Sequence, residues 1–238
     1  MFSLLIANGC GLTRGAELAD PQREAWPAVL GRMLAAPVVN LAADGGSNRR
    51  IVRTTVANLD RICHDAGATP EETLVVCMWT RVDRSERYRR RTARHAGPSA
   101  SESPDEETWL QMDPRHAGAE PAAGAFYRHL FSEAGAVTNW LLDWMGLDGF
   151  LATRGVTARY VCGHEPPVVP AQAGPAAELA SLLHSHGLAG VVGDSFVGIS
   201  RANGWAVGPG GHPLRQAHRH LAEMLAGPLR AGPAGTVA

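Results

Sequence analysis

Cysteine and histidine are among the side chains in this 238-residue sequence that could bind a metal or act as nucleophile or base. The four cysteines form no C-x-x-C pair, and a chain of this length needs no cross-links to fold, so we expect free thiols at Cys10, Cys63, Cys77 and Cys162. Two histidine pairs are two residues apart, a spacing that does not share one helix face: His184 with His186 and His218 with His220. The sequence therefore predicts neither a metal site nor a cofactor.

Glycines and small polar residues follow two short apolar runs. Residues 8–11 (Asn-Gly-Cys-Gly) come after the run at 2–7, and they tolerate unusual backbone angles. Asp44-Gly45-Gly46 follows the run at 38–42 as a tight turn, and Ser47 can cap the helix that comes next. We expect both places to be loops that present polar groups.

These loops are positioned by alternating strands and helices. Apolar runs at about 2–7, 38–42 and 74–79 are typical of buried strands, and the segments between them carry apolar residues at helical spacing. This order implies right-handed crossovers and a parallel sheet. Ligands bind such sheets beyond the carboxyl ends of the strands, so the loops after Ala7, Ala42 and Met78 should converge.

The rest of the chain returns to this pattern after an interruption. Helical periodicity resumes at 126–147, a strand is predicted at 156–161, a short helix at 176–186 and a closing helix from Pro213. Between 82 and 125 the periodicity is lost, and the polar stretch at about 88–125 is interpreted as an insertion, either a lid or a solvated tether. Residues 90–107 should be mobile. We expect one domain over 1–228 and a frayed tail over 229–238.

Charge and hydropathy exclude several classes of partner. Lys and Arg number 22 against 23 Asp and Glu, so no net charge favours nucleic acid or an anionic membrane. No apolar run approaches 18 residues, and Met1 to Ala7 has no basic region or cleavage site of a secretory signal. The sequence predicts a cytoplasmic protein.

Four blocks in order resemble those of the SGNH/GDSL hydrolases. Residues 8–15 (NGCGLTRG) resemble the first block in its bacterial N-G-C-S-F-T variant, and residues 40–48 (NLAADGGSN) resemble the second. Trp79-Thr80 with Arg84 resembles the third block of a branch that lacks Gly-x-Asn, and Gly211-His212-Pro213 resembles the last. The resemblance implies a three-layer α/β/α sandwich with a parallel, flavodoxin-like sheet.

The departures from that family decide what chemistry is expected. The nucleophilic serine would fall at position 11, which is Gly11, and the aspartate three residues before the basic histidine would fall at Pro209. His212 remains as the expected catalytic residue, beside a cradle that could hold an oxyanion. The expected ligand-binding residues are Cys10, Gly11, Thr13, Asp44, Gly45, Gly46, Ser47, Asn48, Trp79, Thr80 and Arg84.

Other interpretations of these residues stay open. Cys10 or Thr13 could replace the serine as nucleophile. The side chain of Cys10, the neighbour of position 11 along the strand, would however point to the opposite face. The literal Gly193-Asp194-Ser195 is interpreted as a turn near the His212 loop. Asp44, Asn48 and His212 could serve as helix caps instead, and Trp140 with Trp144 should pack in the core.

Three functions follow from the resemblance. The first is a degenerate, SGNH-like protein of a bacterial natural-product pathway that binds a small acyl, amino-acid-like or anionic ligand, free or on a carrier protein. Its finer form is one subunit, with a homologous partner, of an enzyme that closes an aziridine or azabicycle by displacing sulfate. The others are a hydrolase with a non-standard nucleophile and a non-catalytic subunit that stabilises a partner. Because Pro209 cannot orient His212, Gly11→Ser alone is not expected to restore ester hydrolysis.

Overall fold

A parallel sheet forms the centre of the computed structural model, which describes residues 2–88, 109–165, 177–179, 181 and 195–230. Within these residues the strand order is β2-β1-β3-β6, made by β1 (Leu4–Asn8), β2 (Val38–Asn40), β3 (Thr73–Trp79) and β6 (Thr157–Cys162). All the pairings in this sheet are parallel. The sheet thus brings the carboxyl ends of these strands to one edge, as the sequence predicts.

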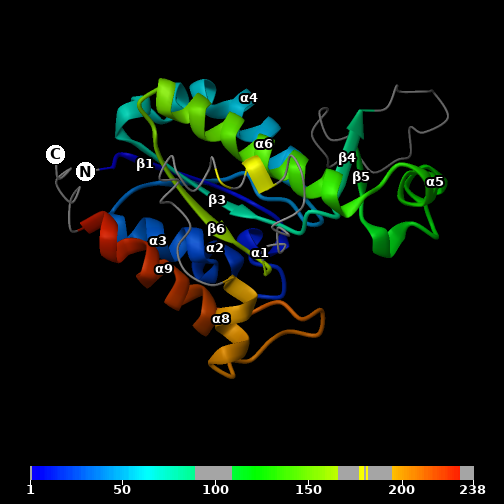
Figure 1. Cartoon of the computed structure of the whole chain (residues 1–238). Coiled ribbons are helices and arrows are strands. Elements are labelled where there is room, and N and C mark those ends of the chain that lie inside the picture. Colours follow the sequence, from blue (N-terminus) through cyan, green and yellow to red (C-terminus); the bar gives the residue numbers. More distant parts are fainter. Residues whose placement is uncertain (1, 89–108, 166–176, 180, 182–194, 231–238) are drawn as a thin grey trace, which may run out of the picture.

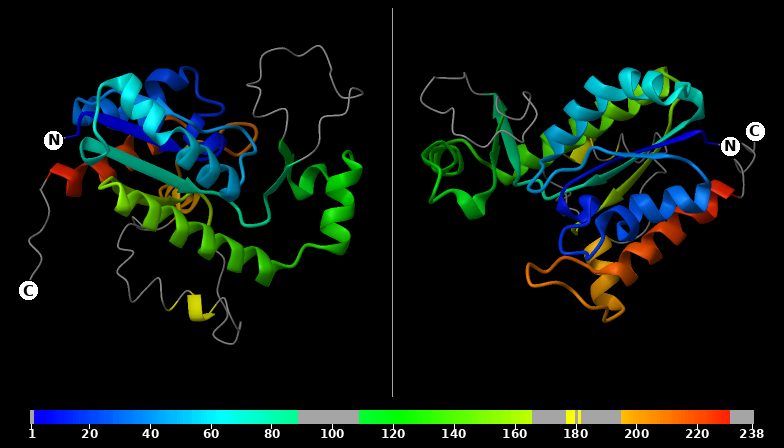
Figure 2. Two further views of the ribbon diagram at one scale, coloured as in Figure 1. Left: turned by 90° about the horizontal axis from the view of Figure 1, so that it is seen from above. Right: turned by 180° about the vertical axis from the view of Figure 1, so that it is seen from behind.

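Helices cover both faces of the sheet (Figures 1 and 2). Figure 1 shows α4 (Asn48–Ala66) and α6 (Glu133–Thr153) on one face, and α3 (Trp26–Leu34) and α9 (Arg215–Arg230) on the other. Three short helices lie on the second side: α1 (Gly11–Arg14), α2 (Pro21–Glu24) and α8 (Phe196–Ala202). The predicted three-layer α/β fold is confirmed.

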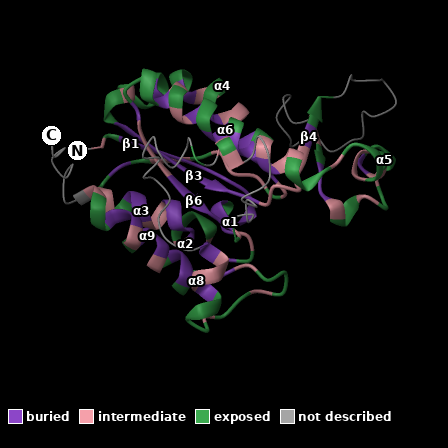
Figure 3. Cartoon of the chain, viewed as in Figure 1, coloured by how far each residue is buried: buried purple, intermediate pink, exposed green. Residues whose placement is uncertain are grey.

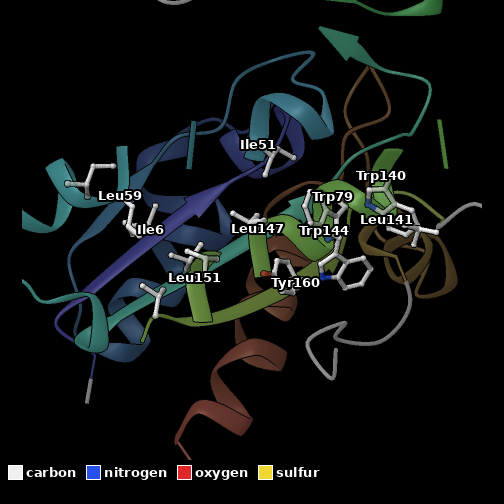
Figure 4. Close-up of a cluster of buried hydrophobic side chains, with 14 of the residues drawn as sticks. Ile6, Ile51, Leu59, Trp79, Trp140, Leu141, Trp144, Leu147, Leu151 and Tyr160 are labelled. Carbon is white, nitrogen blue, oxygen red and sulfur yellow. The ribbon is translucent and has the colours of Figure 1, made fainter. Parts of the chain in front are cut away.

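The two layers have separate apolar cores. β1 and β3 are buried along their whole length (Figure 3), which explains why both are apolar at consecutive positions. Between the sheet and α6, Trp79 stacks on Tyr160 with ring centroids 5.7 Å apart, and Trp140 and Trp144 pack beside them (Figure 4). The two tryptophans of α6 are therefore core residues, as predicted.

Local signals set the helix that follows the second loop. Ser47 caps α4, because its hydroxyl accepts a hydrogen bond from the Arg50 N–H at 3.2 Å, and Gly67 ends the helix with a φ of 64°. The strand before it, β2, stops at Asn40 rather than at Ala42. The closing helix begins at Arg215, two residues beyond the proline that the sequence places in its first turn.

The expectation of an irregular stretch between 82 and 125 is wrong for its described part. β4 (Ser85–Tyr88) pairs antiparallel with β5 (Trp109–Met112), followed by η4 (Pro114–His116) and α5 (Pro121–His129). Figure 1 shows this unit beyond one end of the sheet. The phenol of Tyr127 donates to the carbonyls of Asp83 and Met112, at 2.7 and 2.9 Å. Half-buried hydrogen bonds of this kind, which leave no apolar period in the sequence, help to hold the unit together.

Several sequence predictions fall outside the described residues. These are the mobility of residues 90–107, most of the helix at 176–186, the turn residues Gly193 and Asp194, and the end of the tail. A short 3-10 turn, η1 (Pro70–Glu72), leads into β3. Among the described helices, none combines the length and the apolar character needed to cross a membrane.

Candidate active site

The loop after β1 is held in place by a buried asparagine. The Asn8 side-chain amide donates to the carbonyl of Ile51 and to the hydroxyls of Thr54 and Thr55 on α4, and its own oxygen accepts from the N–H of Gly9. This places Gly11 at the start of α1, buried at the carboxyl edge of the sheet. The asparagine of the first block is thus a structural clamp.

His212 faces the position at which a serine is missing. It lies in the loop between α8 and α9, where Gly211 has a φ of 81° and the N–H of Gly208 donates to the His212 carbonyl. A Cβ at position 11 would stand 3.4 Å from the Nε2 atom of His212. The structure therefore brings the first and last sequence blocks together.

A carboxylate that the sequence analysis missed holds this histidine. Glu17 Oε2 lies 2.9 Å from His212 Nδ1, and the same side chain accepts the backbone N–H groups of Gly210 and His212 at 2.5 and 3.1 Å. The expectation that His212 lacks an acidic partner, because position 209 is proline, is wrong. Glu17 comes from the loop between α1 and α2, with a φ of 68°, and no local sequence signal marks it.

These contacts determine the protonation of both groups. The hydrogen bond from Gly210 N–H, together with those from His212, holds the pKa of the Glu17 carboxyl below its usual value, although desolvation opposes them. An ionised carboxylate can only accept, so Nδ1 of His212 carries the proton that binds it. In the neutral imidazole, the Nε2 atom is then an acceptor that faces position 11, which is the arrangement of a general base.

Asp44 lines the same space from the second loop. Its Oδ1 atom would lie 3.1 Å from a Cβ at position 11, while its Oδ2 atom is paired with the guanidinium of Arg14. Ala16 Cβ, at 3.4 Å from that point, closes another side. Gly45 is next to Asp44, with a φ of 70° and open space where a Cβ would stand.

Other residues of the second and third blocks are engaged in the fold. Gly46 donates its N–H to the carbonyl of Ala43, and the Ser47 hydroxyl caps α4. The Asn48 side chain donates to the carbonyl of Thr80 at 3.1 Å and accepts its N–H at 2.8 Å, which ties the start of α4 to the end of β3. These hydrogen bonds position the second and third loops.

The side chains of the remaining candidates are not among the atoms nearest to a Cβ at position 11. Trp79 and Cys10 are buried in the two cores, with exposed fractions of 1% and 2%. The Thr13 hydroxyl is buried against Gly9. Arg84 donates to the hydroxyl of Thr80 at 2.9 Å and pairs with Asp113 at 3.0 Å. Ser195 caps α8 by accepting the N–H of Gly198 at 2.9 Å.

A pocket of about 400 Å³ opens beyond the ends of β3 and β6. His164, from the loop after β6, lines it together with Thr80 and Arg81. Burial lowers the pKa of His164 to about 4, and Arg84 and Arg81 add to this effect, so its imidazole is neutral at pH 7. The sequence analysis did not single out His164, because nothing around it resembles a motif.

Comparisons with known proteins agree with this geometry at the level of the fold. The structure of TesA aligns over 96% of this chain and 98% of its own, with a TM-score of 0.51 and 15% identity. The psychrotrophic esterase EstA from Pseudoalteromonas sp. covers 96% and 97%, with a TM-score of 0.53 and 10% identity. The lipase Lip_vut3 from a goat rumen metagenome covers 99% of both chains, with a TM-score of 0.50 and 12% identity.

At such low identities these structures establish the fold of the GDSL/SGNH hydrolases and nothing about the reaction. No curated protein matches the sequence. One family model does, over residues 16–231, which include Glu17, Asp44 and His212. The chain therefore belongs to the family described as a family of unknown function (DUF6071).

Proposed function

We propose that this chain is an SGNH-like protein that has lost its own nucleophile and uses His212, held by Glu17, as a general base toward a nucleophile carried by the ligand. The observation that supports this is the pairing of a complete base with an empty nucleophile position. His212 Nδ1 is 2.9 Å from Glu17 Oε2, and its Nε2 atom would lie 3.4 Å from a Cβ at position 11, where this chain has a glycine.

The chemistry follows from the absence of an enzyme hydroxyl at position 11. A ligand that brings an N–H or O–H group within hydrogen-bond reach of His212 Nε2 can transfer its proton to that atom, as the serine hydroxyl does in a hydrolase. The atom that loses the proton then attacks a carbon of the same ligand, and the leaving group departs with the bonding electron pair. Holding both ends of the ligand in one site makes such an intramolecular displacement favourable.

In its finer form, the proposal concerns a small acyl or amino-acid-like ligand of a bacterial natural-product pathway, free or carrier-bound. Ring closure to an aziridine or azabicycle with release of sulfate meets the chemical requirements, because it needs a base and a positioned amine and no enzyme hydroxyl. A homologous partner subunit and a cytoplasmic location belong to the same proposal.

The test restores the missing hydroxyl. A serine side chain at position 11 can reach His212 Nε2, and only the exposed Asp44 side chain must yield slightly to make room. We expect Gly11→Ser to hydrolyse p-nitrophenyl acetate at least about 100-fold faster than the wild type, because Glu17 already orients the imidazole. This reverses the expectation that Pro209 prevents revival.

Two further variants identify the groups responsible. Adding Glu17→Gln to Gly11→Ser should remove most of the gain in rate, because loss of the orienting carboxylate costs a serine protease a factor on the order of 10⁴. Wild-type turnover that disappears in Cys10→Ala would instead show a cysteine hydrolase and overturn the proposal. A folded Gly11→Ser protein with no ester hydrolysis would show that His212 does not act as a base at this position.

A further inference from the structure

We propose that the loop at 208–211 (Gly-Pro-Gly-Gly) positions the base, because Gly208 and Gly210 leave room for the Glu17 carboxylate that orients His212. These two glycines are positioning residues, since they act through Glu17 and His212 rather than on the ligand. The inference rests on the proposed function, because it concerns the same base. It explains how the carboxylate partner of the histidine can come from outside the histidine block.

A turn built around Pro209 gives this loop its shape. The N–H of Gly211 donates to the carbonyl of Gly208 at 2.9 Å, which closes a turn with Pro209 in its second position. Proline is favoured at that position, because its ring already holds φ near about −65°. The turn carries the N–H group of Gly210, which donates to Glu17 Oε1 at 2.5 Å. Pro209 thus helps to present a donor to the carboxylate.

The two glycines leave room that the Glu17 side chain occupies. A Cβ at position 208 would stand 2.5 Å from Glu17 Oε2 and 2.9 Å from its Cβ atom. A Cβ at position 210 would stand 2.9 Å from Glu17 Oε1 and 3.3 Å from His212 Nδ1. Non-bonded carbon atoms pack about 3.5–4.0 Å apart, so a methyl group at either position would displace Glu17.

The backbone itself does not require glycine at either position. Gly211 has a φ of 81°, whereas neither Gly208 nor Gly210 has a positive φ. Alanine can therefore adopt the backbone conformation at 208 and 210, and the obstacle to it is the Glu17 side chain. The absence of side chains at these two positions is thus explained by the carboxylate and not by the turn.

The same carboxylate joins the loop to the imidazole. Glu17 accepts the backbone N–H groups of Gly210 and His212 as well as binding His212 Nδ1. A methyl group that pushes the carboxylate off Gly210 removes its strongest hydrogen bond and moves it away from Nδ1. Without that partner the imidazole is no longer held in the tautomer that accepts a proton on Nε2.

The first experiment measures Glu17 itself in the whole wild-type chain and in Gly208→Ala and Gly210→Ala. NMR follows the pH titration of the Glu17 carboxyl carbon. We expect its midpoint to rise in both variants toward the ordinary pKa of 4.5, because the displaced carboxylate loses N–H donors. The matched control is Gly118→Ala, another exposed loop glycine, where a Cβ would meet no atom within 4 Å and the midpoint should not change.

The second experiment measures the base with p-nitrophenyl acetate. Adding Gly210→Ala to Gly11→Ser should lower kcat at least about tenfold and leave KM within about twofold, because proton transfer depends on the orientation of His212. In Gly11→Ser with Glu17→Ala, the same addition should change kcat by less than about twofold, because the carboxylate through which Gly210 acts is gone. A merely structural role of the loop would give equal losses in both backgrounds.

The third experiment restores the acid of the hydrolase family at position 209. Gly11→Ser with Pro209→Asp should be no faster than Gly11→Ser alone, because Glu17 already binds His212 Nδ1. A faster double variant would show that Glu17 is not an adequate partner, and it would overturn the inference.

An unchanged Glu17 midpoint in both glycine variants, or equal losses of kcat with and without Glu17, would also overturn it. The outcomes separate the two proposals. A raised Glu17 midpoint together with no ester hydrolysis by Gly11→Ser supports the positioning loop and removes the base. Hydrolysis by Gly11→Ser with an unchanged midpoint keeps the base and removes the positioning loop.

Discussion

Glu17 lies 195 residues before His212 in the sequence, yet its carboxylate accepts three hydrogen bonds from the loop that carries the histidine. The backbone of Glu17 has a φ of 68°, a conformation that non-glycine residues adopt rarely and at some energetic cost. The rest of the fold must compensate for this strain. Strained residues cluster at functional sites, and this one orients an imidazole toward a position that has no side chain.

At this scale the contacts of Glu17 predict an unusual titration. The amide resonances of Gly210 and His212 should titrate with a midpoint below pH 4.5, because their N–H groups stabilise the ionised carboxylate and lower its pKa. The stabilisation is present above the ordinary glutamate pKa and is lost as the pH falls through the lowered one. NMR measures the midpoint. A value at or above 4.5, or the same titration in Glu17→Gln, would contradict the assignment.

At the scale of elements, one side chain joins the second and third loops of the site. Asn48 is the first residue of α4, and its amide makes both hydrogen bonds to the backbone of Thr80, just after β3. Both residues are buried. These two hydrogen bonds fix the position of the chain where it leaves β3 toward the β4–β5 hairpin, and with it the positions of Arg81 and Arg84.

Removing this tie should destabilise the protein more than an ordinary helix substitution. Asn48→Ala leaves the N–H of Thr80 buried without a partner, which costs about 1–3 kcal/mol of the free energy of unfolding. Asn58→Ala on the same helix is the control, because its amide bonds only within α4, and a change within about 0.5 kcal/mol is expected. Urea unfolding at pH 7 measures both. Equal effects would show that the Asn48 tie has no special weight.

At the scale of the whole molecule, three buried ionisable groups couple folding to pH. His218 accepts the N–H of Trp26 on its Nδ1 atom at 3.0 Å, and burial lowers its pKa to about 4. Burial lowers the pKa of His164 to the same value. Asp143 on α6 acts in the opposite direction, since burial raises its pKa to about 6 in spite of the Arg49 guanidinium 2.9 Å away.

These shifts predict that the protein loses stability on mild acidification. Between pH 6.5 and 4 the unfolded chain binds protons at both histidines that the folded chain does not, whereas the folded chain binds one more at Asp143. Acidification therefore destabilises the folded state through the two histidines and stabilises it through Asp143. Because the pKa shifts of these groups are comparable, the effect of the two histidines is larger. The midpoint of urea unfolding should therefore be lower at pH 5 than at pH 7.

A single variant checks the assignment of this effect. His218→Gln removes a group whose pKa shift from 6.5 to about 4 corresponds to about 3 kcal/mol between those two pH values. The difference in stability between pH 7 and pH 5 should therefore shrink in this variant. Its stability at pH 7 is expected to fall as well, because the Trp26 N–H loses a well-placed acceptor. A wild-type midpoint that is equal or higher at pH 5 would refute the prediction.

The sequence by itself determined the elements and the common edge to which they lead. Continuous apolar runs mark strands that are buried on both faces, and an apolar period of 3.6 residues marks helices, so β1, β3, α4 and α9 were predictable to within a few residues. The alternation of strands and helices implied the parallel sheet. The absence of a hydroxyl at position 11 is likewise a fact of the sequence, and so is the histidine block before the last helix.

Only the tertiary structure decided what surrounds Gly11. The Glu17 partner of His212, the Oδ1 atom of Asp44 at position 11 and the Tyr127 bonds that hold the hairpin join segments far apart in the chain. No sequence period records such contacts, because they form only after α1, the second loop and the loop before α9 are packed against the same sheet edge. Pro209 therefore suggested that His212 has no orienting carboxylate, because the carboxylate that does orient it, Glu17, comes from another part of the chain.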